Sequence, residues 1–287
     1  MTLKQKFVDY LLLMRLHKPI GIYLLLWPTL WALWLAAGGM PNLKVLLVFV
    51  AGTALMRSAG CAINDFADKD FDSQVARTKD RPLAAGRVTS GEALRLFVAV
   101  SLIAFGLLTS LHNVQAILLA IPAVVLAASY PFMKRWISIP QAVLGLAFSW
   151  GIPMAYAAVR HGVPWFEVSL LMAANVMWVI AYDTFYAMAD RDDDLKIGVK
   201  SSAILFGQYD RLITALLQVG ALLCLAFAGR ERGLVYFVGL VVAAAFAVYQ
   251  QWLIREREPA QCLGAFLNNT WFGAAVFAGL ALDLAAS

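Results

Sequence analysis

Two groups of carboxylates stand at the ends of long apolar segments in this chain. The first is NDFADKDFD, from Asn64 to Asp72, and the second is YDTFYAMADRDDD, from Tyr182 to Asp194. Carboxylates at the edge of a bilayer are costly and repel one another, so each group needs a cation. A shared cation needs a ligand of its own, and the pattern therefore predicts a site for a divalent metal and a diphosphate.

The spacing within the first group predicts a shared helix face. If the preceding helix continues to Asp72, then Asn64, Asp68 and Asp72 lie at i, i+4 and i+8. These three side chains can then converge on one cation. Asp65 also lies on the stripe of Asp72, seven residues before it, whereas Asp70 points away.

The second group has a related spacing. Asp183, Asp190 and Asp194 are separated by seven and four residues, which places them close to one line along a helix. Asp192 and Asp193 lie off that line. An alternative is that both groups form solvated loops that balance nearby basic residues. That alternative explains neither the aligned stripes nor the position of Asp183 inside an apolar run.

The ligand types favour magnesium as the cofactor. Carboxylate oxygens are hard ligands, and magnesium usually binds through a few carboxylates together with substrate phosphates. Basic residues follow each Asp-rich group and can bind the phosphate oxygens that a metal leaves free. These candidates are Arg77 and Arg81 after the first group, and Lys196 and Lys200 after the second.

Composition places these groups in a membrane protein. The 287 residues are 62% hydrophobic and only 14% charged, which is typical of a polytopic membrane protein and leaves little room for a soluble domain. Nine apolar runs can each cross a bilayer as a helix. They are Ile20 to Ala37, Leu43 to Ile63, Leu94 to Leu111, Val114 to Tyr130, Pro140 to Val159, Phe166 to Met188, Leu212 to Gly229, Leu234 to Leu253, and Leu263 to Ala285.

The distribution of Lys and Arg predicts the orientation. Most of the 23 basic residues fall on the side of the N-terminus, which is therefore expected to be cytoplasmic, with the C-terminus outside. We expect one transmembrane domain over residues 1–287, with an amphipathic segment at 1–19 and cytoplasmic Asp-rich loops at 64–93 and 189–211. The absence of a transit peptide favours a bacterial inner membrane. The net charge of +5 fits an anionic leaflet better than nucleic acid.

The chain also suggests two related halves. An apolar span, an Asp-rich end, a basic loop and another span occur from Leu43 onward and again from Phe166 onward. This order predicts a site at the interface of two helical halves around a central cavity.

Several motifs resemble one family. NDxxDxxxD, YDxxYAxxDRDDD, IGxKSxAILFG, MRSAGCxIND, RTKDRPLAAG and SYPFMKRWxxxPQ are similar to those of the UbiA-type intramembrane aromatic prenyltransferases. The resemblance covers nearly the whole chain and is strongest to the bacterial branch that prenylates 4-hydroxybenzoate in ubiquinone synthesis. It implies an all-helical fold of nine spans around a cavity in the lipid bilayer.

The resemblance also implies roles for the residues. Two magnesium ions would hold a polyprenyl diphosphate between Asn64, Asp68 and Asp72 on one side and Asp190 and Asp194 on the other. Asp65 and Asp183 would support them, and Asp68, Asp72, Asp190 and Asp194 would be the catalytic acids.

The acceptor, a carboxylated phenol, needs a cationic partner. Arg135 follows the fourth span and offers a bidentate guanidinium, and Tyr130 lies near it. Tyr130, Tyr182 and Tyr186 could also stabilise an allylic cation through their ring faces.

Other functions were weighed against this one. A cation transporter would place its carboxylates near the middle of the spans, not at two helix ends. A phosphatidyl-type transferase would carry a single acid-rich motif with DG and AR elements, which the chain lacks. Relatives of the same fold that prenylate naphthoate, homogentisate or haem differ mostly in their acceptor contacts, and stay open as alternatives.

Overall fold

The computed structural model describes residues 2–73, 78–133 and 135–287. In these ranges the chain forms helices, without a β-strand, and nine helical segments are long and apolar enough to cross a bilayer, as the sequence predicts. The helices are α1 (Leu3–Leu13), α2 (Ile20–Ala37), α3 (Leu43–Asp72), α4 (Ser90–Thr109), α5 (Val114–Met133), α6 (Pro140–Ser149), α7 (Gly151–Arg160), α8 (Trp165–Ile197), α9 (Ser202–Phe206), η1 (Gly207–Tyr209), α10 (Asp210–Ala228), α11 (Leu234–Leu253), η2 (Ile254–Glu256) and α12 (Pro259–Ala286).

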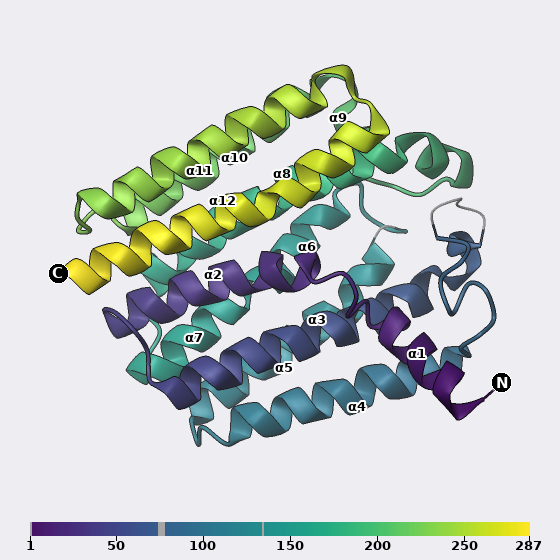
Figure 1. The fold of residues 1–287 in the computed structure, drawn as a ribbon, viewed down its shortest axis with the longest axis horizontal. Helices are drawn as coiled ribbons and strands as arrows, with labels where there is room; N and C mark the ends of the chain where they lie inside the picture. Colours follow the sequence, from purple (N-terminus) through teal and green to yellow (C-terminus); the bar gives the residue numbers. More distant parts are fainter. Residues whose placement is uncertain (1, 74–77, 134) are drawn as a thin grey trace.

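The long helices run side by side in one bundle (Figure 1). The N-terminus lies at one end of the bundle and the C-terminus at the other, as an odd number of crossings requires. Helices α3 and α8 finish at the same end as the N-terminus. We call this end, where α3 and α8 carry the two Asp-rich segments, the acidic end.

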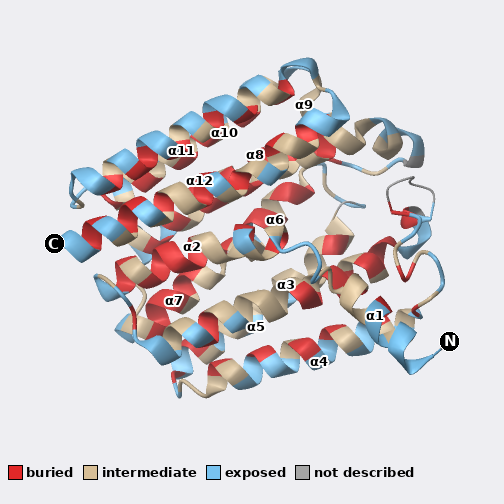
Figure 2. Ribbon diagram, viewed as in Figure 1, coloured by how far each residue is buried: buried red, intermediate tan, exposed pale blue. Residues whose placement is uncertain are grey.

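The outer surface of the bundle is apolar along the long helices. Exposed residues lie on the outward sides of α4, α10 and α11, while buried residues face the interior (Figure 2). Leu102 of α4, Leu223 of α10 and Val241 of α11 are each more than half exposed. An extended apolar surface of this kind suits contact with lipid tails.

Aromatic side chains form the centre of the core. Trp178 of α8 packs against Trp31 of α2, Tyr182 one turn further along α8, and Phe272 of α12, with ring centroids 5.2–5.5 Å apart. The indole Nε1 of Trp178 donates to Oδ1 of Asn269 at 2.8 Å. Because the polar atom of the buried indole has a partner, Trp178 can join α2, α8 and α12 without a desolvation penalty.

Local sequence explains two interruptions near the acidic end and the cavity. Helix α8 ends at Gly198, whose φ of 71° lies in the left-handed region that glycine adopts without strain. Helices α6 and α7 are separated at Trp150 and together make one crossing. Pro153 lacks the N–H that would bond the carbonyl of Ser149, so a continuous helix is disfavoured there.

The helices extend beyond the apolar runs at the acidic end. Helix α3 continues to Asp72 and α8 continues to Ile197, so the segments expected as loops at 64–93 and 189–211 both begin as helix. The second segment also contains α9, η1 and the start of α10. The backbone hydrogen bonds of each helix continue past its apolar part, so the acids of both Asp-rich segments project from helices and not from loops. The relation between two halves stays a prediction.

The close packing of α11 and α12 gives a first testable prediction. A Cβ atom at Gly279 would lie 2.7 Å from Cα of Gly239, so Gly279→Ala must push the two backbones apart. We expect a loss of about 1–3 kcal/mol in stability, seen as a lower apparent melting temperature in detergent. Gly264→Ala, on the same helix with no atom within 4 Å of the new Cβ, is the control. Equal melting temperatures for the two variants would contradict this packing.

Candidate active site

A cavity of about 1690 Å³ lies inside the bundle. Helices α2 to α8 and α12 form its walls, together with the segments that follow α1, α3 and α8. Most lining side chains are apolar, but polar ones from both Asp-rich segments and from the segments that follow them reach it. They include Asn64, Asp65, Asp68, Asp72, Arg81, Asp183, Asp194 and Lys200. The cavity thus brings together eight side chains that the sequence nominates.

Three acids of the first Asp-rich group are buried. Asp65, Asp68 and Asp72 are 1%, 4% and 7% exposed, and Asn64 Nδ2 donates to Asp68 Oδ2 at 3.0 Å. The predicted i, i+4 spacing therefore brings Asn64 and Asp68 into direct contact on α3. Three acids so close together and so far from water need positive charge beside them.

Two arginines supply that charge. Arg81 Nη1 lies 2.7 Å from Asp72 Oδ2 and 3.2 Å from Asp65 Oδ1, and Arg15 Nη2 lies 2.6 Å from the same Asp65 oxygen. Burial raises the pKa of the Asp72 carboxyl above its ordinary value, and the Arg81 guanidinium opposes that shift. Thr78 Oγ1 donates to the Asp72 carbonyl at 2.8 Å and so holds the start of the segment that carries Arg81.

The donor atoms of this site suit magnesium. They are carboxylate oxygens and the amide of Asn64, all hard ligands. Within the described ranges, no three His, Cys, Asp or Glu side chains are already gathered as a metal site. Magnesium commonly takes only one or two protein carboxylates and completes its shell with phosphate and water. The carboxylates that α3 and α8 present to the cavity suit this shared coordination by protein, phosphate and water, and not a site made of protein ligands alone.

Only part of the second Asp-rich group lies at the cavity. Asp183 and Asp194 line the cavity, whereas Asp190, although on the same helix, is not among the lining residues. Asp183 lies eleven residues before Asp194 and is half-buried, so α8 contributes carboxylates at two depths.

The candidate phosphate-binding cations also differ in position. Arg81 and Lys200 line the cavity, and Lys200 Nζ donates to the Trp136 carbonyl at 3.1 Å. Lys196 is exposed and pairs with Asp193 at 3.1 Å. Arg77 lies outside the described residues.

Of the two candidate acceptor residues, one lines the cavity and the other does not. Tyr130 lines the cavity. Arg135 is exposed, lies outside the set of lining residues, and donates to the carbonyl of Ala67. The cavity instead contains another guanidinium, that of Arg57 in the middle of α3.

Arg57 was not assigned a role from sequence. Its guanidinium contacts Cys61 Sγ, one turn nearer to Asp68, and a Cβ at residue 21 would overlap it, so Gly21 provides its space. Cys61 and Asp68 are seven residues apart, or about 10 Å along the helix. The sequence does point to Arg57 by its position inside an apolar span, because a charged residue within a membrane span is a functional candidate by default. Arg15, the second cation of the acidic cluster, had no such signal.

Comparison with known proteins gives consistent results. The family model described as "UbiA prenyltransferase family" matches residues 25–278. The protein of Nitrosococcus oceani named 4-hydroxybenzoate octaprenyltransferase is 58% identical over 282 residues, which are 98% of each chain. The protein of the same name from Chromohalobacter salexigens is 56% identical over 278 residues, 96% of this chain and 93% of that one.

Solved structures agree on the fold. A UbiA homologue from Aeropyrum pernix K1, in its apo form, superposes with a TM-score of 0.79 at 26% identity and covers 92% of this chain and 97% of that one. A UbiA homologue from Archaeoglobus fulgidus bound to GPP and Mg²⁺ gives a TM-score of 0.68 at 17% identity, over 95% and 99% of the two chains. The family model, the relatives and the fold together show that this chain belongs to the UbiA prenyltransferase family.

Proposed function

We propose that the protein transfers a polyprenyl group from polyprenyl diphosphate to 4-hydroxybenzoate, with release of diphosphate, in ubiquinone biosynthesis. The new bond forms at the ring carbon ortho to the hydroxyl. The observation that carries the proposal is one cavity that contains carboxylates of both Asp-rich segments and an intramembrane arginine. The names of the relatives at 58% and 56% identity support 4-hydroxybenzoate as the acceptor.

The diphosphate of the donor would bind at the acidic end. Asn64, Asp68 and Asp72 on α3 and Asp190 and Asp194 on α8 would hold magnesium. When bound, magnesium would draw electron density from the diphosphate and weaken the allylic carbon–oxygen bond. Arg81 and Lys200 line the cavity and are positioned to bind the remaining phosphate oxygens, with Arg77 and Lys196 as further candidates.

The wall of the cavity would protect the reacting carbon from water. When the carbon–oxygen bond breaks, the diphosphate leaves with the electron pair, and the allylic carbon becomes positive. Tyr182 and Tyr186 pack against Phe266, with ring centroids 5.9 and 5.0 Å apart, and all three line the cavity. Aromatic faces of this kind stabilise a cation without attacking it. The ring of the acceptor then forms the carbon–carbon bond and loses the proton from that carbon.

The acceptor would lie between the acidic end and Arg57. A benzoate ring is short enough to fit into the stretch of about 10 Å that separates Cys61 from Asp68. The Arg57 guanidinium would bind the carboxylate, and Tyr130 would line the same space. This assignment uses Arg57 in the role that the sequence suggested for Arg135.

The polyprenyl tail would follow the apolar part of the cavity into the bilayer. Leu102 and Phe105 of α4 and Ile121 of α5 line the cavity and are each more than one-third exposed. The positive-inside distribution supports a bacterial inner membrane, with the N-terminus and the acidic end in the cytoplasm.

Product formation by the purified protein in detergent tests the function. The assay uses a polyprenyl diphosphate and a panel of 4-hydroxybenzoate, dihydroxynaphthoate and homogentisate, each with Mg²⁺ or EDTA. We expect prenylated 4-hydroxybenzoate only with Mg²⁺. Preference for another acceptor would show that the protein is a prenyltransferase of the same fold with a different acceptor. If no acceptor is consumed while the protein carries a cation across liposomes, a transport function would replace this one.

In that assay, Asp68→Asn and Asp190→Asn should each lower turnover by about 10²-fold or more, because each removes a charge that holds the metal. Asp70→Asn and Asp192→Asn are matched controls, since both side chains are exposed neighbours off the predicted stripes. Gel filtration and melting temperature should show that all four variants fold. Full activity in Asp68→Asn or Asp190→Asn would remove that carboxylate from the metal site.

Arg81 should matter most for stability when metal is absent. Arg81→Met removes the guanidinium that bridges Asp65 and Asp72, and we expect a lower melting temperature in EDTA that Mg²⁺ partly restores. Arg87→Met is the control, because Arg87 pairs with the equally buried Asp9 at 2.9 Å. It should be destabilised without rescue by Mg²⁺. Equal responses of the two variants to Mg²⁺ would contradict a metal site beside Arg81.

Arg57 should determine acceptor binding. Arg57→Gln is expected to raise KM for 4-hydroxybenzoate by about 10-fold or more, with little change in KM for the diphosphate, because a charge-assisted contact to the carboxylate is lost. Arg57→Lys should recover part of the affinity. Arg135→Gln is the comparison variant. A raised acceptor KM in Arg135→Gln but not in Arg57→Gln would reverse the assignment.

A further inference from the structure

A buried serine in the cavity wall has a hydroxyl that bonds none of the described residues. Ser201 lines the cavity and is 5% exposed. Its Oγ is buried and makes no hydrogen bond to any described residue. A buried hydroxyl without a partner is destabilising, so such a group usually has a ligand or water to bind.

The position of Ser201 in the chain makes the missing bond unusual. Ser201 is the N-cap residue of α9, where a serine normally accepts a hydrogen bond from a backbone N–H of the first helical turn. Its backbone is extended, with φ −147° and ψ 158°, as an N-cap requires, but its side chain makes no capping bond. The hydroxyl therefore has an unused donor among the described residues, and it belongs to a residue that lines the cavity.

The surroundings of Ser201 indicate an anionic ligand. It follows Lys200, another lining residue, and lies three residues beyond Gly198, which ends the helix of the second Asp-rich segment. Asp194, Lys200 and Ser201 thus reach the same cavity as Asp68 and Arg81. A hydroxyl beside a lysine can donate to an oxygen of a phosphate group.

Neighbouring contacts fix this segment in place. Ser202 N donates to Gln141 Oε1 at 3.2 Å, and Ser202 Oγ lies 2.7 Å from Thr184 Oγ1 on α8. Arg191 Nη2, also on α8, donates to the Ala203 carbonyl at 2.7 Å. The backbone on the C-terminal side of Ser201 is therefore tied to α6 and α8.

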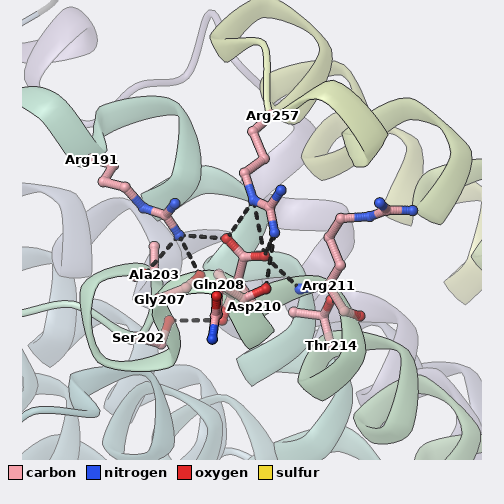
Figure 3. Close-up of polar contacts among 10 residues, drawn as sticks. Arg191, Ser202, Ala203, Gly207, Gln208, Asp210, Arg211, Thr214 and Arg257 are labelled. Atoms are coloured by element: carbon pink, nitrogen blue, oxygen red, sulfur yellow. Dashed lines mark hydrogen bonds and ion pairs between the residues drawn. The ribbon is translucent and has the colours of Figure 1, made fainter.

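An ion cluster holds Arg191 in turn. Arg191 and Arg257 approach the buried Asp210 from two sides, with nitrogen–oxygen distances of 2.5 and 2.8 Å (Figure 3). Arg257 also donates to the Gln208 carbonyl at 3.0 Å. Because α8, η1, α10 and the segment before α12 meet at this cluster, the α9 region is held before any ligand binds, and the Ser201 hydroxyl needs little reorganisation.

We propose that Ser201 is a binding residue for the donor substrate, whose hydroxyl donates a hydrogen bond to a non-bridging oxygen of the diphosphate. This inference rests on the proposed function and extends it, since it adds a neutral donor on the α8 side to the cations. The diphosphate would then be held between Arg81, which follows α3, and Lys200 with Ser201, which follow α8.

The test compares Ser201→Ala with Ser101→Ala. Ser101 on α4 also lines the cavity, and its buried hydroxyl likewise has no partner in the part of the chain that the structure describes. Because Ser101 lies in the middle of a span, it controls for the loss of such a group. We expect Ser201→Ala to raise KM for the prenyl diphosphate about 10-fold, with KM for 4-hydroxybenzoate unchanged. Ser201→Thr, which keeps the hydroxyl, should retain wild-type KM. Ser101→Ala should also behave as wild type.

A binding readout separates this inference from the proposed function. Melting temperatures are measured with and without geranyl diphosphate and Mg²⁺. Ser201→Ala should match the wild type without ligand, or exceed it, because an unsatisfied hydroxyl is removed, and should gain less from the ligand. Full stabilisation of Ser201→Ala by ligand, with unchanged KM, would overturn the role of Ser201 alone. A wild-type protein that the ligand does not stabilise and that forms no product would overturn the proposed function and this inference together.

Discussion

Mutual repulsion among the buried carboxylates at the end of α3 is the main electrostatic cost that this fold must offset. Asp65, Asp68 and Asp72 are almost inaccessible to water, where an unpaired charge would be very costly. Arg15 and Arg81 compensate two of these acids directly. Such a cluster is stable only with cations beside it, and this requirement makes it receptive to a metal that brings a polyanionic ligand.

The fold can be understood as the support of that cluster. Aromatic packing around Trp178 joins α2, α8 and α12, and the ion cluster at Asp210 fixes the backbone that follows α8. Both devices act on α8, so Asp183 and Asp194 reach the cavity from a rigid element. The cavity between α3 and α8 then combines a charged end with apolar walls, as a reaction through an allylic cation requires.

Much of this arrangement follows from sequence periodicity. Apolar runs predict the nine crossings, and the i, i+4 spacing of Asn64 and Asp68 predicts their contact on α3. Partner choice across the fold does not follow from spacing. Arg15 and Asp65 are fifty residues apart in the chain, and only the packing of the segment after α1 against α3 brings them together. For Arg57, the only indication in the sequence is its position in the middle of a span. Periodicity does not specify which helix face borders the cavity.

The position of the bound metal tests whether α3 and α8 share one diphosphate site. Crystals grown with Mn²⁺ and a non-hydrolysable geranyl diphosphate analogue would give anomalous difference peaks at the metal sites. We expect peaks within about 2.5 Å of carboxylate oxygens on both α3, at Asp68 or Asp72, and α8, at Asp190 or Asp194, with the diphosphate between them. Peaks at only one helix, or a diphosphate bound away from both Asp-rich segments, would contradict it.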